Sequence, residues 1–328
     1  MQEMNKPTQN QEELLIGIGD LHGHLPALES LLSQLQERES IFRDSPQEHI
    51  LRPGVEIVFT GDYIDRGTQN RKLIDQLIRL RERNPYAVHE LFGNHELMAL
   101  ASLPIASSLT SMDKEEALHH YRGTAVHGFN GGDKFVNEFS EGEESPFPEY
   151  VRQMSRGGKV GDWMRSLEAL YRTTSVNKKK ILFVHGGVPY KTINDRESLD
   201  AFATEFTRHM RVRSSTQITE ARAKYLNSTV VDGRSPFGDR GSPQMDEESV
   251  RTLTAALGVD YIVIGHTPQE NGCIAVYHQR IINVDVGMSQ CYGENVPAAV
   301  VFKNDGVHGF YADGRDDLLV NTEDKQGN

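Results

Sequence analysis

The stretch "FTGDYIDRGTQN", residues 59–70, decides how the chain is interpreted. It follows an apolar run and places Asp62, Asp65 and Arg66 close together between Gly61 and Gly67. A solvated turn would explain this charge, because Asp is also favoured at the start of a helix. The alternative is a set of ligands on a backbone that must approach its target closely, which glycine allows.

The composition indicates a globular protein with an acidic balance. The chain has 328 residues, a formal net charge of −12, 37% hydrophobic residues and 25% charged residues. This length suits one large α/β domain or two small ones. We expect no nucleic-acid partner, because binding to a phosphate backbone depends mainly on neutralisation by Lys and Arg.

The N-terminal sequence and the cysteine content indicate a protein of a reducing compartment. The chain has only two cysteines, Cys273 and Cys291, which excludes a disulfide scaffold. The polar start "MQEMNKPTQNQEELL" lacks the apolar core of a secretory signal. No stretch approaches the ~20 apolar residues of a membrane span. We therefore expect a cytoplasmic protein with no membrane partner.

Buried strands alternate with amphipathic helices along the first hundred residues. Apolar runs at 14–20, 54–62 and 87–96 predict strands, and leucines at helical spacing between them predict helices. This order is typical of βαβ units and a mostly parallel sheet. Two more apolar runs, at 179–187 and 260–268, predict buried strands, and the last third alternates like antiparallel strands joined by turns.

We expect one folded domain over residues 13–315, between a disordered tail at 1–12 and a second tail at 316–328. Glycine, glutamate, asparagine and proline over 123–150 predict a long loop or a partly helical insertion, within an inserted segment at about 110–160. A helix is predicted at 160–175, and a helical region at about 190–258. His119 and His120 are interpreted as a solvated helical pair, and Trp163 as a core residue.

All five buried strands end in short polar motifs. The motifs are GDLHG (19–23), GDYID (61–65), GNHE (93–96), HGG (185–187) and GHT (265–267). Ligands bind beyond the carboxyl ends of strands in an α/β sheet, so these ends can line one crevice. Oxygen and imidazole ligands without thiolate suit Mn, Fe or Zn, and two ions can share one carboxylate. The side chains gathered in this way are Asp20, His22, Asp62, Asp65, Arg66, Asn94, His95, His185 and His266.

The five motifs together resemble those of the calcineurin-like binuclear metallophosphoesterases, and within them the phosphoprotein phosphatase group. That group has the signature GDxHG, GDxxDRG, GNHE, HGG and a late histidine, and here the resemblance spans about residues 14–302. The segments "GHTP" and "VDVGMSQCYG" are more similar to the bacterial and Shewanella-like branch. The resemblance implies a mixed β-sheet sandwich flanked by helices, in four α/β/β/α layers, and a metallophosphoesterase catalytic domain over 13–315.

The resemblance also implies a centre with two divalent or trivalent metal ions. Mn is the ion expected in vitro, with Fe or Zn as alternatives. In this family a hydroxide that bridges the ions attacks phosphorus in line with the leaving oxygen. The implied ligands are Asp20, His22 and Asp62 for the first ion, and Asp62, Asn94, His185 and His266 for the second.

The same resemblance assigns the charged residues that follow Asp62. Arg66 would bind two phosphate oxygens with its planar guanidinium. Asp65 would orient His95, and His95 would protonate the leaving group as a general acid. Asp62 itself would bridge the two ions, so the resemblance favours ligands over a solvated turn at residues 59–70.

A second phosphate-binding arginine is expected in the loop before the late histidine. The segment "PFGDRG" (236–241) favours Arg240, and Arg234 is the competing candidate. Arg240 is expected to be a catalytic residue as well as a substrate contact. The expected substrate contacts are Arg66, Arg240, Asn94 and Tyr292.

We expect a Ser/Thr- or Tyr-protein phosphatase that acts on a phosphoprotein, a phosphopeptide or a small phosphomonoester. One alternative is a symmetrical dinucleoside tetraphosphatase, which carries the same signature. A second is a non-catalytic scaffold, which would lack at least one ligand or the general acid. A cysteine-based phosphatase is set aside, because Cys273 has Arg280 seven places on and Cys291 has no arginine nearby. The insertion at 123–150 is expected to overhang the metals and to shape a substrate groove.

Overall fold

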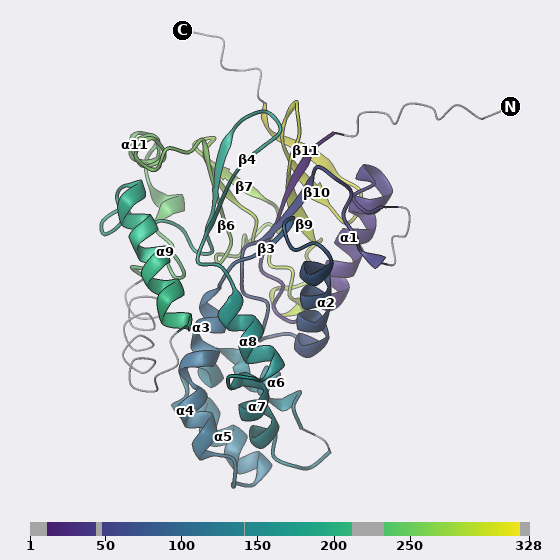
Figure 1. Ribbon diagram of the computed structural model, residues 1–328, viewed down its shortest axis with the longest axis vertical. Helices are drawn as coiled ribbons and strands as arrows, with labels where there is room; N and C mark the ends of the chain where they lie inside the picture. Colours follow the sequence, from purple (N-terminus) through teal and green to yellow (C-terminus); the bar gives the residue numbers. More distant parts are fainter. Residues whose placement is uncertain (1–11, 44–47, 141, 212–232, 322–328) are drawn as a thin grey trace, which may run out of the picture.

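Two β-sheets built largely from the predicted apolar runs form the centre of the molecule (Figure 1). The computed structural model describes residues 12–43, 48–140, 142–211 and 233–321. The six-stranded sheet has the order β11-β10-β9-β1-β2-β3, and the five-stranded sheet the order β4-β5-β6-β8-β7. The strands of the first sheet are β1 (Leu14–Ile18), β2 (Val55–Phe59), β3 (Val88–Glu90), β9 (Ala298–Phe302), β10 (Gly306–Tyr311) and β11 (Asp316–Asn321).

Parallel strands occupy the part of each sheet that leads to the polar motifs. In the first sheet β1, β2 and β3 are parallel, and β9 to β11 continue it in antiparallel pairing. In the second sheet β5, β6 and β8 are parallel, and β4 and β7 form antiparallel edges. The strands of the second sheet are β4 (Tyr171–Thr174), β5 (Lys180–Phe183), β6 (Tyr261–Ile264), β7 (Ala275–Tyr277) and β8 (Ile281–Asn283).

The central strands of the second sheet, β5, β6 and β8, are almost entirely buried, which explains their continuous apolar sequences. On β5, Ile181 and Phe183 belong to the main core cluster, whereas Leu182 between them belongs to a second cluster. The ring of Phe183 meets the ring of Phe302 from the first sheet at 6.5 Å between centroids. Successive side chains of a strand point to opposite faces, so one cluster lies between the sheets and the other outside the second sheet.

Helices cover both outer faces of the sandwich. In Figure 1, α1 (Leu25–Glu39) and α2 (Asn70–Arg83) lie on one side, and α9 (Arg196–Arg211) and α11 (Glu247–Leu257) on the other. The second core cluster joins Leu199 of α9 and leucines of α11 to the outward residues of β5 and β6. The predicted α/β/β/α layering is therefore confirmed.

A helical lobe, defined as residues 103–140 and 142–166, gathers at one end of the sandwich (Figure 1). Between residues 123 and 150 it contains more helix than loop, because its aromatic side chains pack together and extend the main core: Phe135 packs against Tyr150 and Phe139. Its elements follow α3 (Asn94–Ala101) and are α4 (Leu103–Ser108), α5 (Lys114–Thr124), the π-helix η2 (Gly128–Gly132), α6 (Asp133–Asn137), α7 (Phe147–Met154) and α8 (Lys159–Ser166).

Two predicted boundaries differ from the structure. The helix predicted at 160–175 ends at Ser166, because Leu167 takes an extended conformation and residues 171–174 pair with β5 as strand β4. Residues 316–321, predicted as a tail, form β11, whose backbone pairs with β10 at the edge of the sheet. The predicted tails at 1–11 and 322–328, and part of the helical region (212–232), lie outside the described residues.

Two minor expectations are confirmed. His119 and His120 are exposed on α5, and Trp163 is buried, with its indole N–H donating to Glu90 Oε2 at 2.9 Å. Across the described ranges, no helix has both the length and the apolar character needed to cross a bilayer.

The contact between the sheets leaves no room for a side chain at Gly17. A Cβ there would lie 2.8 Å from Val300 Cγ1 and 2.9 Å from Phe183 Cε1. We expect Gly17→Val to lower the free energy of unfolding by about 1–3 kcal/mol, measured by urea denaturation, because overpacking strains a dense core. Gly123→Ala is the control, since a Cβ there meets no atom within 4 Å. An unchanged midpoint for Gly17→Val would contradict this packing.

Candidate metal centre and active site

The carboxyl ends of strands from both sheets meet at one edge of the sandwich. Asp62 follows β2 in the first sheet, and His185 and His266 follow β5 and β6 in the second. The two sheets are joined here by hydrogen bonds: the His266 N–H donates to the Asp20 carboxylate at 3.0 Å, and His185 Nδ1 lies 2.9 Å from the Thr60 carbonyl oxygen. The structure thus brings the five predicted strand-end motifs together.

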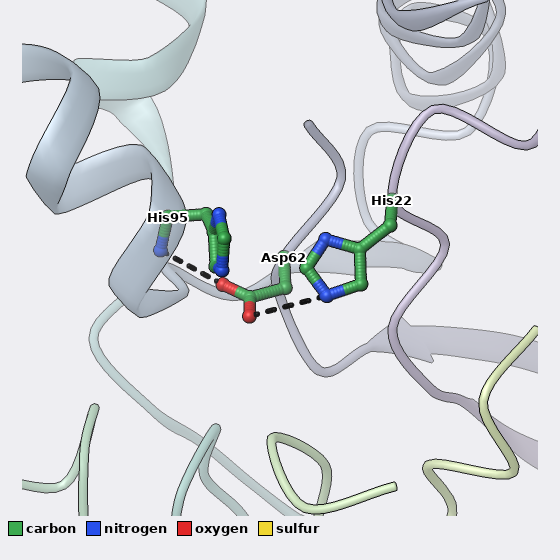
Figure 2. A group of neighbouring side chains, drawn as sticks. All are labelled: His22, Asp62 and His95. Carbon is green, nitrogen blue, oxygen red and sulfur yellow. Dashed lines mark hydrogen bonds and ion pairs between the residues drawn. The ribbon is translucent and has the colours of Figure 1, made fainter. Parts of the chain in front are cut away.

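Asp62 is shared by two groups of side chains whose ligand-type atoms lie within 4.8 Å of one another. Figure 2 shows the first group, in which the Asp62 carboxylate lies between His22 and His95. The second group joins Asp62 to His185 and His266. One oxygen of Asp62 is 3.7 Å from His22 Nε2, and the other is 3.4 Å from His185 Nε2.

The imidazoles present lone pairs toward this carboxylate. A carbonyl oxygen can only accept a hydrogen bond, so His185 Nδ1 is protonated and donates to the Thr60 carbonyl. In the same way, His22 Nδ1 donates to the Ile64 carbonyl at 2.8 Å. His185 Nε2 then faces Asn94 Oδ1 at 3.0 Å, as well as Asp62. Acceptor atoms that face one another in a buried site form a donor set that fits a cation.

The protonation states also fit metal ligation, which requires neutral imidazole and ionised carboxylate. Burial, with the charges of His95 and Arg66, lowers the pKa of His22 to about 3. Burial also holds the pKa of His266 well below its usual value. Burial opposes ionisation of Asp62, but His185 and His95 hold the pKa of Asp62 well below its ordinary range.

Five residues of these motifs have left-handed backbone conformations. Their φ angles are 42° at His22, 54° at Asp62, 74° at Asp65, 63° at Arg66 and 68° at His266. Such conformations cost non-glycine residues about 1–3 kcal/mol each and persist only where surrounding contacts hold them. Their concentration at one edge of the sandwich marks a functional site.

Glu96 provides much of that support. Its Oε2 accepts the N–H groups of Gly93 (3.0 Å) and Asp62 (3.1 Å), and its Oε1 accepts that of Tyr63 at 2.9 Å. The side chain is fully buried. Sequence reasoning assigned Glu96 no role, although its position three residues after Gly93 is that of a capping-box glutamate.

Asp20 has a different environment from the other predicted ligands, and neither three-residue group includes it. Its two oxygens accept the His266 N–H at 3.0 and 3.1 Å. Burial, Asp285 and Asp62 raise the pKa of Asp20, and burial raises the pKa of Asp285 to about 6. Sequence reasoning missed Asp285, which closely follows β8 and extends the series of polar strand ends to a third strand of the second sheet.

His95 and Asp65 form the buried pair that the resemblance implied. His95 Nδ1 lies 2.6 Å from Asp65 Oδ2, and both side chains are almost fully buried. Although burial opposes its ionisation, His127 and His95 lower the pKa of Asp65 to about 2. Asp65 therefore holds His95 in one orientation, with its Nδ1 proton directed away from Asp62.

Arg66 and Tyr292 lie beside the first group. Arg66 Nη1 is 2.8 Å from His22 Nε2, whose lone pair accepts this hydrogen bond. The guanidinium carbon lies 5.2 Å from the centre of the Tyr292 ring, within the range of a cation–π contact.

A cleft of about 1070 Å³ opens over the second group and is lined by Asn94 and His266. Both candidate arginines, Arg234 and Arg240, lie in its wall, and Arg240 Nη1 donates to Thr267 Oγ1 at 3.2 Å. The choice between them therefore stays open.

Comparison with known proteins agrees with the fold and the motifs. Residues 14–270 match the family of calcineurin-like phosphoesterases, so the chain belongs to that family. An uncharacterized protein of Schizosaccharomyces pombe is 24% identical over 306 residues, which cover 89% of this chain and 78% of that protein. A serine/threonine-protein phosphatase of Caenorhabditis elegans is 24% identical over 268 residues, 81% of this chain but 45% of the relative.

Solved structures share the architecture. A cold-active protein tyrosine phosphatase superposes with a TM-score of 0.64 at 22% identity, covering 94% of this chain and 79% of that one. A structure of such a phosphatase from a psychrophilic Shewanella species gives a TM-score of 0.60 at 20% identity, covering 94% and 81%. The predicted family and fold are confirmed, and the chain is a phosphoester hydrolase of a family that uses divalent metal ions.

The contacts of the Glu96 carboxylate predict how replacing it with an amide would change stability and metal binding. Glu96→Gln should lower the free energy of unfolding by about 1–3 kcal/mol in chelator-treated protein, because an NH₂ group would face backbone N–H donors. It should also weaken Mn²⁺ binding about 10–100-fold by calorimetry, as the Asp62 turn loosens. Glu149→Gln, at an exposed pair with Arg152, is the control. Wild-type metal affinity and stability in Glu96→Gln would contradict the supporting role.

Proposed function

We propose that this protein is a metal-dependent phosphomonoesterase that acts as a Ser/Thr- or Tyr-protein phosphatase. The observation that carries the proposal is the shared position of Asp62. The imidazole of His22 lies against one oxygen of this carboxylate and that of His185 against the other, while Arg66 and the Asp65–His95 pair lie against the same turn.

In this proposal Asp20, His22 and Asp62 would hold the first ion, and Asp62, Asn94, His185 and His266 would hold the second. When bound, the ions would provide positive charge for the phosphate and lower the pKa of a water molecule, supplying the nucleophile. Arg66 binds phosphate oxygens with two N–H groups, which favours the in-line geometry. Arg240, or Arg234, binds from the cleft wall, and Tyr292 keeps Arg66 in place.

His95 acts as the general acid. With Nδ1 bonded to Asp65, the proton that can be transferred is held at Nε2, on the side of the ring away from Asp65. Transfer to the leaving oxygen neutralises the alkoxide or phenoxide as the P–O bond breaks. The contribution is largest for a strongly basic leaving group, such as the side-chain oxygen of serine.

The substrate class is supported by the cleft and by the relatives. Exposed Tyr190 lines the cleft. An exposed aromatic side chain beside the candidate site suits a peptide chain. Relatives named as a serine/threonine and a tyrosine phosphatase favour the same class.

A dinucleoside tetraphosphatase remains the second candidate for one reason. The cleft gathers Lys191, Arg234 and Arg240, a set of cations that a polyphosphate would also require. The acidic net charge of the whole chain does not describe this local environment.

The expected position of the insertion is supported by Asn130 in the cleft wall and by Gly131, where a Cβ would lie 3.5 Å from Arg66 Cγ. Deletion of residues 130–146 is, however, a poor test of substrate selection. It would remove Phe135 and Phe139 from the core of the helical lobe, so a general loss of activity would report unfolding.

The proposal is tested by assaying the manganese-loaded protein against four substrates: phosphotyrosine peptide, phosphoserine peptide, nitrophenyl phosphate and diadenosine tetraphosphate. We expect metal-dependent release of phosphate from at least one peptide and from nitrophenyl phosphate, lost on chelation. Preference for diadenosine tetraphosphate would establish the second candidate. Failure to bind or take up manganese, with no turnover, would indicate a non-catalytic scaffold.

His95→Ala tests the general acid. We expect kcat to fall about 10²–10⁴-fold for phenyl phosphate, whose leaving group needs a proton, and far less for nitrophenyl phosphate. His119→Ala, at an exposed position on α5, is the matched control and should leave both rates unchanged. Equal damage to both substrates by His95→Ala would exclude the proposed role.

A further inference from the structure

A buried chain of hydrogen bonds extends from His95 into the helical lobe. Asp65 Oδ2 lies 2.6 Å from His95 Nδ1, and the other oxygen, Oδ1, lies 2.8 Å from His127 Nε2. His127 Nδ1 in turn lies 2.9 Å from the Tyr121 hydroxyl oxygen. The side chains of His127 and Asp65 have no measurable exposure to solvent.

The lobe holds His127 in one orientation. Its backbone N–H donates to Ser102 Oγ at 3.2 Å, and its ring lies nearly parallel to that of Tyr150, with 6.4 Å between centroids. A Cβ at Gly132 would come within 2.4 Å of three ring atoms, so the backbone of η2 closes over the imidazole. Such packing holds the ring in its present position.

Asp65 determines which nitrogen of His127 carries the proton, because an ionised carboxylate can only accept a hydrogen bond. In the neutral imidazole the other nitrogen, Nδ1, accepts from the Tyr121 hydroxyl. Nε2 then carries the proton and donates to Asp65 Oδ1. Both oxygens of Asp65 are thereby occupied by imidazole donors, and the carboxylate cannot rotate without losing a hydrogen bond to one of them.

We propose that His127 is a positioning residue for the general acid: it holds the Asp65 carboxylate in the orientation that directs His95 toward the leaving group. This inference rests on the role of His95 under the proposed function. It makes the lobe a part of the machinery that protonates the leaving group, in addition to a wall of the cleft.

The expected size of the effect follows from the hydrogen bond between His127 and Asp65. A bond to a charged group contributes about 1.5–3 kcal/mol, and its loss leaves Asp65 Oδ1 buried without that donor. If Asp65 turns to recover a donor, His95 loses its orientation. We expect His127→Leu to lower kcat about 10–100-fold for aryl phosphates with basic leaving groups, and little for nitrophenyl phosphate.

The experiment measures the slope of log kcat against leaving-group pKa for aryl phosphates, using full-length protein loaded with manganese. His127→Leu should steepen the slope toward that of His95→Ala. His127→Gln should restore most of the wild-type slope, because its amide N–H can reach Asp65 from the position of Nε2. Thermal unfolding and bound manganese are measured for each variant, since a purely structural role would lower stability or metal content without changing the slope.

Parallel variants separate failure of this inference from failure of the proposed function. A wild-type slope for His95→Ala would overturn the general acid itself. A steep slope for His95→Ala with a wild-type slope for His127→Leu would overturn only the role of His127. If His127→Leu does not fold, Tyr121→Phe removes the donor that orients the imidazole, and a wild-type slope in that variant would also contradict the inference. The His95→Ala/His127→Leu double variant should be no steeper than His95→Ala alone.

Discussion

One buried carboxylate, that of Glu96, holds together the backbone on which the candidate site depends. It accepts three N–H groups from the turns that follow β2 and β3, two adjacent parallel strands. Asp62 could not keep its left-handed conformation on its own preference, since the conformation is unfavourable for any residue with a Cβ. Once that turn is fixed, the two oxygens of Asp62 point to opposite groups of imidazoles.

The sandwich is needed for the whole candidate site, because its side chains come from both sheets. His22 and Asn94 come from the sheet of β1 to β3, whereas His185 and His266 come from the sheet of β5 and β6. Core packing between the sheets thus determines the distances between the candidate ligands, and a shift of the sheets would separate the two groups of side chains. A substitution that loosens the apolar core between the sheets would therefore also change the geometry of the polar edge.

The fold and the strand-end motifs could be predicted because they are local. An apolar run that ends in glycine and a polar residue marks both a buried strand and its carboxyl end. Asp285 was missed because β8 looked like part of an antiparallel hairpin, although it also pairs in parallel with β6. His127 was missed for another reason: it lies in a glycine-rich segment without periodicity, and its partner Asp65 is 62 positions away. β11 was not predicted, because it begins with the charged residue Asp316 and is held at the edge of the sheet mainly by backbone pairing.

The contact between His127 of the helical lobe and Asp65 has a consequence for engineering. Inserted segments between β3 and β4 would ordinarily be regarded as interchangeable modules that alter selectivity. Here a transplanted module would also have to bring an imidazole, or an amide of equal reach, to the same carboxylate. A chimera whose new segment reproduces only the shape of the cleft would bind its new substrates. It would hydrolyse substrates with basic leaving groups slowly.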